Sequence, residues 1–309
     1  RDKLIVFAQD EIYQIVGTSG ADVQMNPITR KLGCLDRGTI QEVGGDIIFL
    51  APDGLRTIAG TERIGDIELG TVSKPIQKRI NEINFDNLNS VVIREKSQYR
   101  LFYPDDDNVE TVCKGLIGTL KRNLEGTVGW QWSDIIGIKP TCTDSKYFGS
   151  TEYIVHGDDN GFVYRQEQSN RFNGSTTNSS TGTAISAAYK SPDIVFGDSG
   201  VRKNMQRILL NVESEGDLDF SLLMRYNYNN SDTPQPSAIS ISETSGVAVF
   251  GNALSTFGTA VFGSFGSPLI RKSIEGSGFS SAVHIIDTAS TTPYSIRGFQ
   301  LEYTPGGRY

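Results

Sequence analysis

The side chains that most often do chemistry are sparse in this chain. Of its two histidines, His156 precedes a Gly-Asp-Asp-Asn-Gly turn and His284 lies in an apolar run. Neither belongs to a grouping with metal-ligand spacing, and no nucleophile elbow, phosphate loop or dinucleotide fingerprint occurs. The sequence therefore predicts no catalytic residues, no metal and no cofactor. A glycosidase carboxylate pair is the one enzymatic alternative, because Asp and Glu are plentiful.

The cysteines do not form a recognisable site either. Cys34, Cys113 and Cys142 are far apart, and none belongs to a Cys-x-x-Cys pair. An odd number of unpaired cysteines is typical of buried thiols in a reducing compartment.

Two tryptophans are the clearest candidate for ligand recognition. Trp130 and Trp132 are two residues apart in a strand-like run, which places both indoles on one face. Such a pair packs against neighbouring elements, or it forms a stacking platform for a sugar or a base.

One compact basic cluster follows the pattern of a short helix over residues 74–81. Ile76, Arg79 and Ile80 have i, i+3, i+4 spacing, and a serine and a proline precede them as helix-start signals. Lys74, Lys78 and Arg79 would form either a solvated helix face or a contact with an acidic partner or a phosphate backbone.

The elements that must position these side chains are strands. Apolar, β-branched runs flank turn residues in four places, with markers at Asp10, Asp53, Lys96 and Asn160. The first two steps are 43 residues and the third is 64. A period of about 40–50 residues with several strands per unit is typical of β-propeller blades, and an unrelated series of sandwich hairpins is the alternative.

The sequence predicts an all-β protein with three parts. Residues 1–168 would be β-propeller blades, 169–184 a polar linker, and 185–309 a β-sandwich-like domain. A closed propeller needs more blades than these hairpins supply, so we expect further blades upstream of residue 1.

The overall charge bears on partners. With 309 residues, a net charge of −7 and a pI of about 5.0, the chain lacks the basic footprint that wrapping DNA or an anionic membrane requires. No apolar run approaches the roughly 20 residues of a membrane span.

Several stretches, in order along most of the chain, resemble the tail nozzle, or packaged-DNA stabilisation, proteins of short-tailed bacteriophages. They are the hairpin 4–17, GCLDR at 33–37, IFLAPDGLR at 48–56, SKPI at 73–76, GDDNGFVY at 157–164, FGDSGVRKN at 196–204 and GFQLEYTPGGR at 298–308.

The resemblance implies a propeller-containing virion protein, assembled in the host cytoplasm into a homohexameric ring below the portal and adaptor. Such a ring forms the channel that retains packaged DNA and releases it at infection, and the family has no catalytic residues. An acidic subunit suits a channel through which double-stranded DNA slides. Cationic side chains would then mark constrictions or partner contacts; the candidates are Lys74, Lys78, Arg79, Arg202 and Lys203.

A second hypothesis is a non-catalytic, carbohydrate-binding propeller with Trp130 and Trp132 as its platform. The ring hypothesis predicts a stable oligomer, whereas the glycan hypothesis predicts a monomer or small oligomer with measurable sugar affinity.

Overall fold

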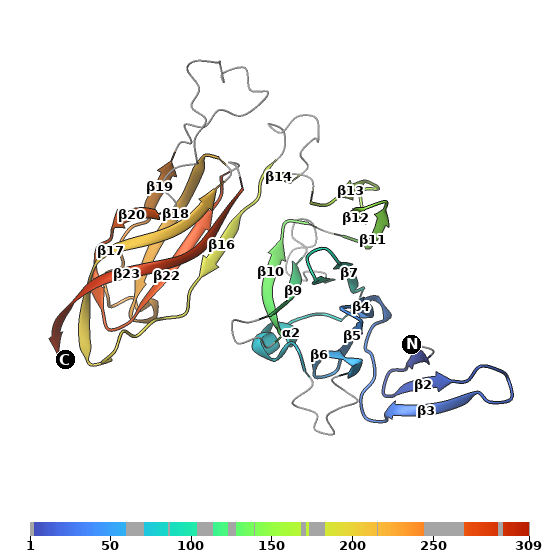
Figure 1. Cartoon of the computed structure of the whole chain (residues 1–309). Helices are drawn as coiled ribbons and strands as arrows, with labels where there is room; N and C mark the ends of the chain where they lie inside the picture. Colours follow the sequence, from blue (N-terminus) through green and yellow to red (C-terminus); the bar gives the residue numbers. More distant parts are fainter. Residues whose placement is uncertain are drawn as a thin grey trace, which may run out of the picture. The chain divides into compact units, whose positions relative to one another are not determined.

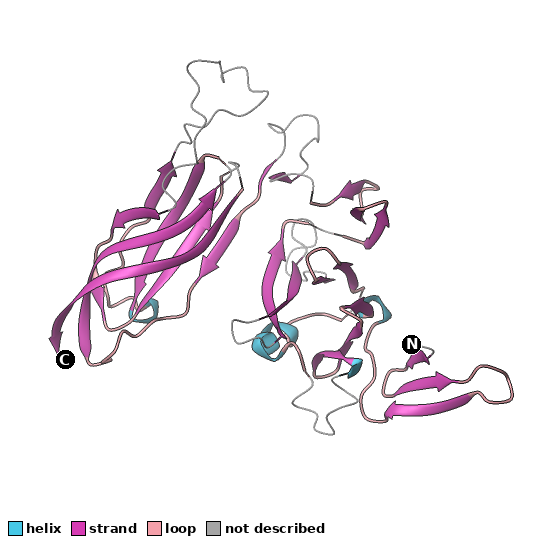
Figure 2. Ribbon diagram, in the orientation of Figure 1, coloured by secondary structure: helices cyan, strands magenta, loops and turns pink. Residues whose placement is uncertain are grey.

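The structure, a computed structural model, describes residues 3–59, 71–85, 87–103, 114–122, 128–138, 140–167, 171–172, 183–214, 216–243, 269–289 and 293–308. Strands dominate it, and the few helices are short (Figure 2). The predicted all-β fold class is confirmed. The chain divides into two compact units, Arg1–Gln168 and Ser169–Tyr309, which are described separately.

Unit 1 contains four small antiparallel sheets in chain order (Figure 1). The first is β1 (Lys3–Phe7), β2 (Ile12–Val16) and β3 (Gln24–Thr29); the second is β4 (Gln41–Val43), β5 (Asp46–Ala51) and β6 (Gly54–Thr57). The third is β7 (Asn89–Ile93), β8 (Gln98–Tyr103), β9 (Lys114–Arg122) and β10 (Val128–Ile136); the fourth is β11 (Cys142–Phe148), β12 (Thr151–Gly157) and β13 (Val163–Arg165).

The second sheet packs through both faces because its central strand is apolar from Ile47 to Ala51. In β5, Ile48 and Leu50 belong to the core shared with the third sheet. Phe49 and Ala51 point the other way, into the core shared with the first sheet, where Phe49 lies 5.1 Å from Phe7 between ring centroids. One strand thus supplies two cores, as the twofold side-chain period of a strand allows.

The third sheet repeats this arrangement. Val92 and Leu101 face the second sheet, whereas Val91 and Phe102 form a core with Ile154 of the fourth sheet. The four sheets therefore pack one against the next in chain order, as neighbouring propeller blades do. Closure of the series into a propeller stays a prediction.

The two terminal sheets each keep one bare face among the described residues. Leu4 and Met25 on the first sheet are 63% and 54% exposed, and Phe148 and Val163 on the fourth are 62% and 76% exposed. Large apolar side chains this exposed, gathered on a sheet face, indicate a contact surface.

The predicted turn markers all lie in hairpin connections, but not in equivalent ones. Asp10 and Lys96 lie between the first and second strands of their sheets, while Asp53 and Asn160 lie between the second and third. The 43-residue spacing therefore does not measure the repeat of one structural position.

The predicted helix near 74–81 is present as a 3₁₀ turn, η2 (Lys74–Ile76), followed by α2 (Gln77–Ile80). Ile80 is buried in the core between the second and third sheets. Ser73 does not cap this helix; its buried hydroxyl instead accepts a hydrogen bond from the backbone N–H of Leu55 at 3.0 Å.

Unit 2 has two four-stranded sheets. One runs β16 (Ala187–Lys190), β22 (Ser281–Asp287), β18 (Leu218–Tyr226), β19 (Ile239–Glu243). In the other, β17 (Val201–Ser214) pairs with β23 (Tyr294–Arg308) along one edge and with β20 (Leu269–Ser273) and β21 (Ser277–Gly278) along the other.

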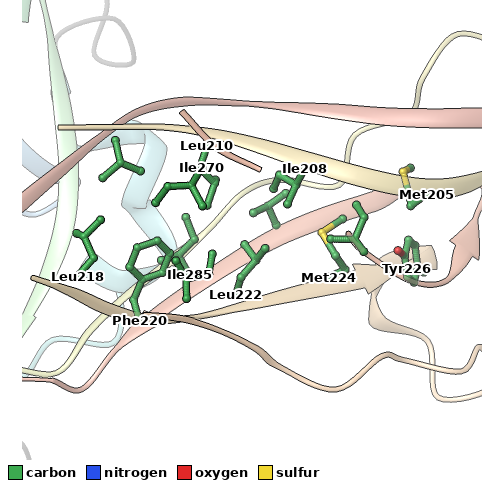
Figure 3. Packing of buried hydrophobic residues seen from close by; sticks show 14 residues of the cluster. Met205, Ile208, Leu210, Leu218, Phe220, Leu222, Met224, Tyr226, Ile270 and Ile285 are labelled. Carbon is green, nitrogen blue, oxygen red and sulfur yellow. The ribbon is translucent and has the colours of Figure 1, made fainter. Parts of the chain in front are cut away.

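The two sheets of unit 2 share one apolar core (Figure 3). Strict alternation along β18 buries every second side chain, from Leu218 and Phe220 to Met224 and Tyr226. At the start of unit 2, β14 (Arg171–Phe172) pairs with β15 (Thr183–Ala184). The rest of the predicted linker, 169–170 and 173–182, lies outside the described residues.

Candidate functional site

The basic cluster of η2 and α2 lies at the surface of unit 1. Lys74 and Lys78 are exposed, and neither forms an ion pair among the residues that the structure describes. Arg79 is also exposed, but its guanidinium lies 3.2 Å from Asp134 on β10 and 3.5 Å from Glu82. The negative charge of Asp134 raises the pKa of Arg79. Of the three cations in this cluster, Lys74 and Lys78 are therefore the ones left to attract an anionic partner, as far as the described residues show.

The tryptophans stack on each other, so each ring covers one face of the other. The ring centroids of Trp130 and Trp132 are 5.6 Å apart with an interplanar angle of 19°, and both half-buried rings pack against the core below them. The indole N–H of Trp132 donates to the carbonyl of Val72 at 3.0 Å. This arrangement favours the packing interpretation over the platform.

Gly118 on β9 makes room for these rings. A Cβ at this position would lie 2.6 Å from Cζ3 of Trp132 and 3.0 Å from Cε3 of Trp130. The third sheet and the helix meet at the same place, through the Trp132–Val72 hydrogen bond and the Arg79–Asp134 ion pair. The structure thus brings together two candidate groups that lie about fifty residues apart in the sequence.

In unit 2, the two neighbouring cations of β17 have opposite environments. Arg202 is exposed, and its Nε donates to the hydroxyl of Ser277 at 2.9 Å. Lys203 is only 2% exposed, and its ammonium donates to the carbonyls of Asp198 at 2.6 Å and Phe279 at 3.3 Å. The assignment of Lys203 as a lumen or partner contact is therefore wrong. It joins two loops inside the unit.

A polar network that the sequence did not reveal joins the third and fourth sheets. The buried guanidinium of Arg100 donates to the side-chain oxygen of Gln166 at 3.0 Å and to Glu167 at 2.6 Å. Gln166 in turn lies 3.1 Å from Nδ1 of His156, and burial lowers the pKa of this histidine despite the opposing charge of Asp158.

A second contact also joins the third and fourth sheets. The buried carboxylate of Glu152 on β12 accepts hydrogen bonds from the backbone N–H groups of Arg94 and Glu95, both at 3.0 Å. These two charge-assisted hydrogen bonds from the turn after β7 hold the third and fourth sheets in one relative orientation.

The bare face of the fourth sheet combines aromatic rings with cations. The guanidinium of Arg165 lies 3.8 Å from the ring centroid of Tyr153, and Nζ of Lys146 lies 5.7 Å from that of Phe148. Phe148 meets Tyr153 edge to face. Alternation along β11 and β12 carried the signal for this face, since the three side chains Lys146, Phe148 and Tyr153 fall on one side of paired strands.

No protein-family model matches this chain, and no curated protein matches it. The described residues hold no cluster of three or more His, Cys, Asp or Glu side chains placed to bind a metal ion. Among those same residues, no helix has the length and apolar character to cross a membrane.

Proposed function

We propose that this chain is a non-catalytic structural subunit of the tail of a short-tailed bacteriophage. Identical copies would assemble into a ring, a hexamer by analogy with the family that the sequence resembles. The ring would contact the tail adaptor and portal and surround the channel through which packaged DNA is retained and released. The sequence resemblance supplies the virion setting of this proposal.

The observation that carries the need for neighbours is the pair of bare apolar sheet faces in unit 1. The two inner sheets pack on a neighbouring sheet through both faces, whereas the outer faces of the first and fourth sheets leave large apolar side chains exposed, among them Leu4 and Val163. Surfaces of this kind are stable in water when another subunit covers them.

The charge of the chain supports a wall along which DNA slides. A net charge of −7 repels the phosphate backbone as a whole. Lys74 and Lys78, which are exposed on the short helix, would supply local contacts with passing phosphates. Glycan binding on Trp130 and Trp132 has less support, because these rings stack on each other and over Gly118.

Light scattering and negative-stain imaging of the full, undenatured chain test the proposal. The expected result is a closed ring with a central hole and a mass that is an integral multiple of 33.8 kDa. A monodisperse monomer that persists at every accessible concentration, and after the addition of the isolated adaptor and portal proteins, would contradict it.

A further inference from the structure

We propose that the two bare sheet faces of unit 1 bind each other between copies of the chain. The outer face of the first sheet of one copy would seat on the outer face of the fourth sheet of the next. This inference rests on the proposed ring assembly. In it, a neighbouring copy covers the first sheet in place of the further blades that the sequence predicts upstream of residue 1.

The outer face of the first sheet is entirely apolar in its two central rows. Strand pairing aligns Leu4 with Ile15 and Ile15 with Met25, and a second row consists of Val6, Tyr13 and Pro27. The opposite face carries Ile5 and Phe7, which pack on the second sheet. The outer rows have no such cover among the residues that the structure describes.

The outer face of the fourth sheet has a different chemistry. Cys142, Gly157 and Val163 form one row, and Phe148, Tyr153, Lys146 and Arg165 lie beside it on the same side of the strands. The cations lie on the aromatic rings, and their aliphatic stems extend the apolar surface.

Charge decides which faces pair. The first sheet places one carboxylate at its outer face, because the hydroxyl of Tyr13 donates to Glu11. The fourth sheet carries Lys146 and Arg165 against one acid, Asp144. First-to-fourth pairing therefore joins opposite net charges, whereas fourth-to-fourth pairing sets cations against cations.

The geometry of this contact is one that unit 1 already uses. Three times along the chain, one small sheet packs its apolar face on the next. A contact between two different faces of identical subunits is heterologous, and such contacts close into a ring when the rotation between copies allows. An intermolecular fourth-to-first contact would continue the internal series from one copy to the next.

The prediction of buried thiols is wrong for Cys142, which is exposed on the fourth-sheet face. Cysteine cross-linking through this thiol therefore tests the pairing directly. A Met25→Cys substitution adds a thiol to the first-sheet face, in a Cys113→Ser background. A short bis-maleimide should then link chains into dimers and higher species, with a yield that rises with protein concentration. The matched control adds Cys142→Ser, which should abolish the ladder.

The possible outcomes separate this inference from the proposed function. A cross-linked monomer with a concentration-independent yield would overturn the inference, because the two faces would then meet within one chain. Intact rings without any cross-link would also overturn it, while leaving the ring proposal standing. Monomers that form neither rings nor cross-links at any protein concentration would contradict the ring proposal as well.

A substitution on the fourth-sheet face gives an independent readout. Val163→Asp should shift the assembly midpoint to at least about tenfold higher protein concentration, because it places a carboxylate in an apolar row. Val195→Asp makes the same change at an exposed valine in unit 2 and should leave assembly unchanged. Equal effects of the two substitutions would overturn the assignment of the surface, and circular dichroism verifies that both variants are folded.

Discussion

Lys203 and its neighbour Arg202 show how strand alternation separates two cations of the same sequence motif. Lys203 shares its side of β17 with the buried Met205, whereas Arg202 points to solvent. The buried ammonium is held by two backbone carbonyls, Asp198 and Phe279. Its role is therefore to fix the loops at one end of the sandwich.

Replacing Lys203 with methionine should destabilise unit 2 by about 1–3 kcal/mol, because two carbonyl groups lose their donor. Arg202→Met is the matched control and should change stability by less than about 0.5 kcal/mol, as surface substitutions usually do. Urea unfolding followed by circular dichroism measures both. Equal losses in the two variants would show that the burial of Lys203 contributes nothing.

Gln166 determines the tautomer of His156. The guanidinium of Arg100 can only donate, so Gln166 presents its oxygen there and its NH₂ group to Nδ1 of His156. Nδ1 must then accept, and the proton of the neutral ring lies on Nε2. If Nδ1 were protonated, its N–H would face the NH₂ group of Gln166, and no hydrogen bond could form between these two donors.

Stability should fall as the pH is lowered through the range below about 6.5. Burial lowers the pKa of His156 in the folded state, and burial with Lys190 and Arg225 lowers that of His284. The unfolded chain therefore takes up protons first, and the stabilisation present above pH 6.5 is lost toward the folded pKa values.

Chemical denaturation at about pH 7.5 and about pH 5 measures this loss. His156→Gln should reduce the difference between the two pH values, and His284→Gln should reduce it separately. With two histidines in the chain, nitrogen-resolved NMR can identify each tautomer; an Nδ1-protonated neutral ring at His156 would contradict the network.

At the scale of elements, β9 and β10 act as one unit because Gly118 accommodates both indole rings. A methyl group at Gly118 would approach the Trp132 ring to 2.6 Å, which is closer than van der Waals contact allows. The rings would have to move, and the Trp132–Val72 hydrogen bond would lengthen or break.

Gly118→Ala should destabilise unit 1 by about 1–3 kcal/mol, the usual cost of overpacking, and should shift tryptophan emission to longer wavelength. Since both tryptophans of the chain belong to this pair, the fluorescence reports on them directly. Gly298→Ala on β23, where a Cβ meets nothing within 4 Å, is the control and should leave the emission unchanged. Unchanged emission in Gly118→Ala would contradict the packed arrangement.

Much of the element content could be predicted from the sequence. The hairpins follow from β-branched runs around short polar turns, and the short helix follows from the spacing of Ile76 and Ile80. The repeat could not be derived in the same way, because hairpin turns look alike wherever they lie in a sheet. Asp53 and Lys96 therefore matched in spacing without matching in position.

The candidate site was harder to predict than the fold. The Arg79–Asp134 pair and the network from Arg100 to His156 join residues that are more than fifty positions apart, and no local pattern encodes such contacts. The burial of Lys203 did have a local signal, its alternation with Met205 along β17. The prediction that Lys203 lies at the surface used its residue type and ignored this alternation.

At the scale of the whole molecule, the excess of acidic groups should make binding to free duplex DNA weak. We expect a Kd above about 10⁻⁴ M at about 150 mM salt, at or beyond the weak end of non-specific DNA binding. Fluorescence anisotropy with a labelled duplex measures this. Micromolar binding at that salt concentration would contradict a channel wall along which DNA slides.

The two exposed lysines should account for part of the contact that remains at low salt. Lys74→Ala with Lys78→Ala should weaken it more than Lys121→Ala with Lys190→Ala, which remove the same charge at other exposed positions. Equal losses in the two double variants would indicate a general charge effect, with no special role for the helix.

β5 supplies apolar side chains to two cores, so its apolar pattern alone does not specify one pairing register. In a strand with one solvent-facing side, a one-residue shift of the pairing register is unfavourable because it turns the apolar side chains toward water. In β5 the shift exchanges one apolar set for another. The adjoining turn must therefore discriminate, through the positive φ of Gly54 and the clasp of Asp53 on Arg56. The register of β5 is therefore specified locally, by Asp53, Gly54 and Arg56, and not by the apolar pattern of the strand.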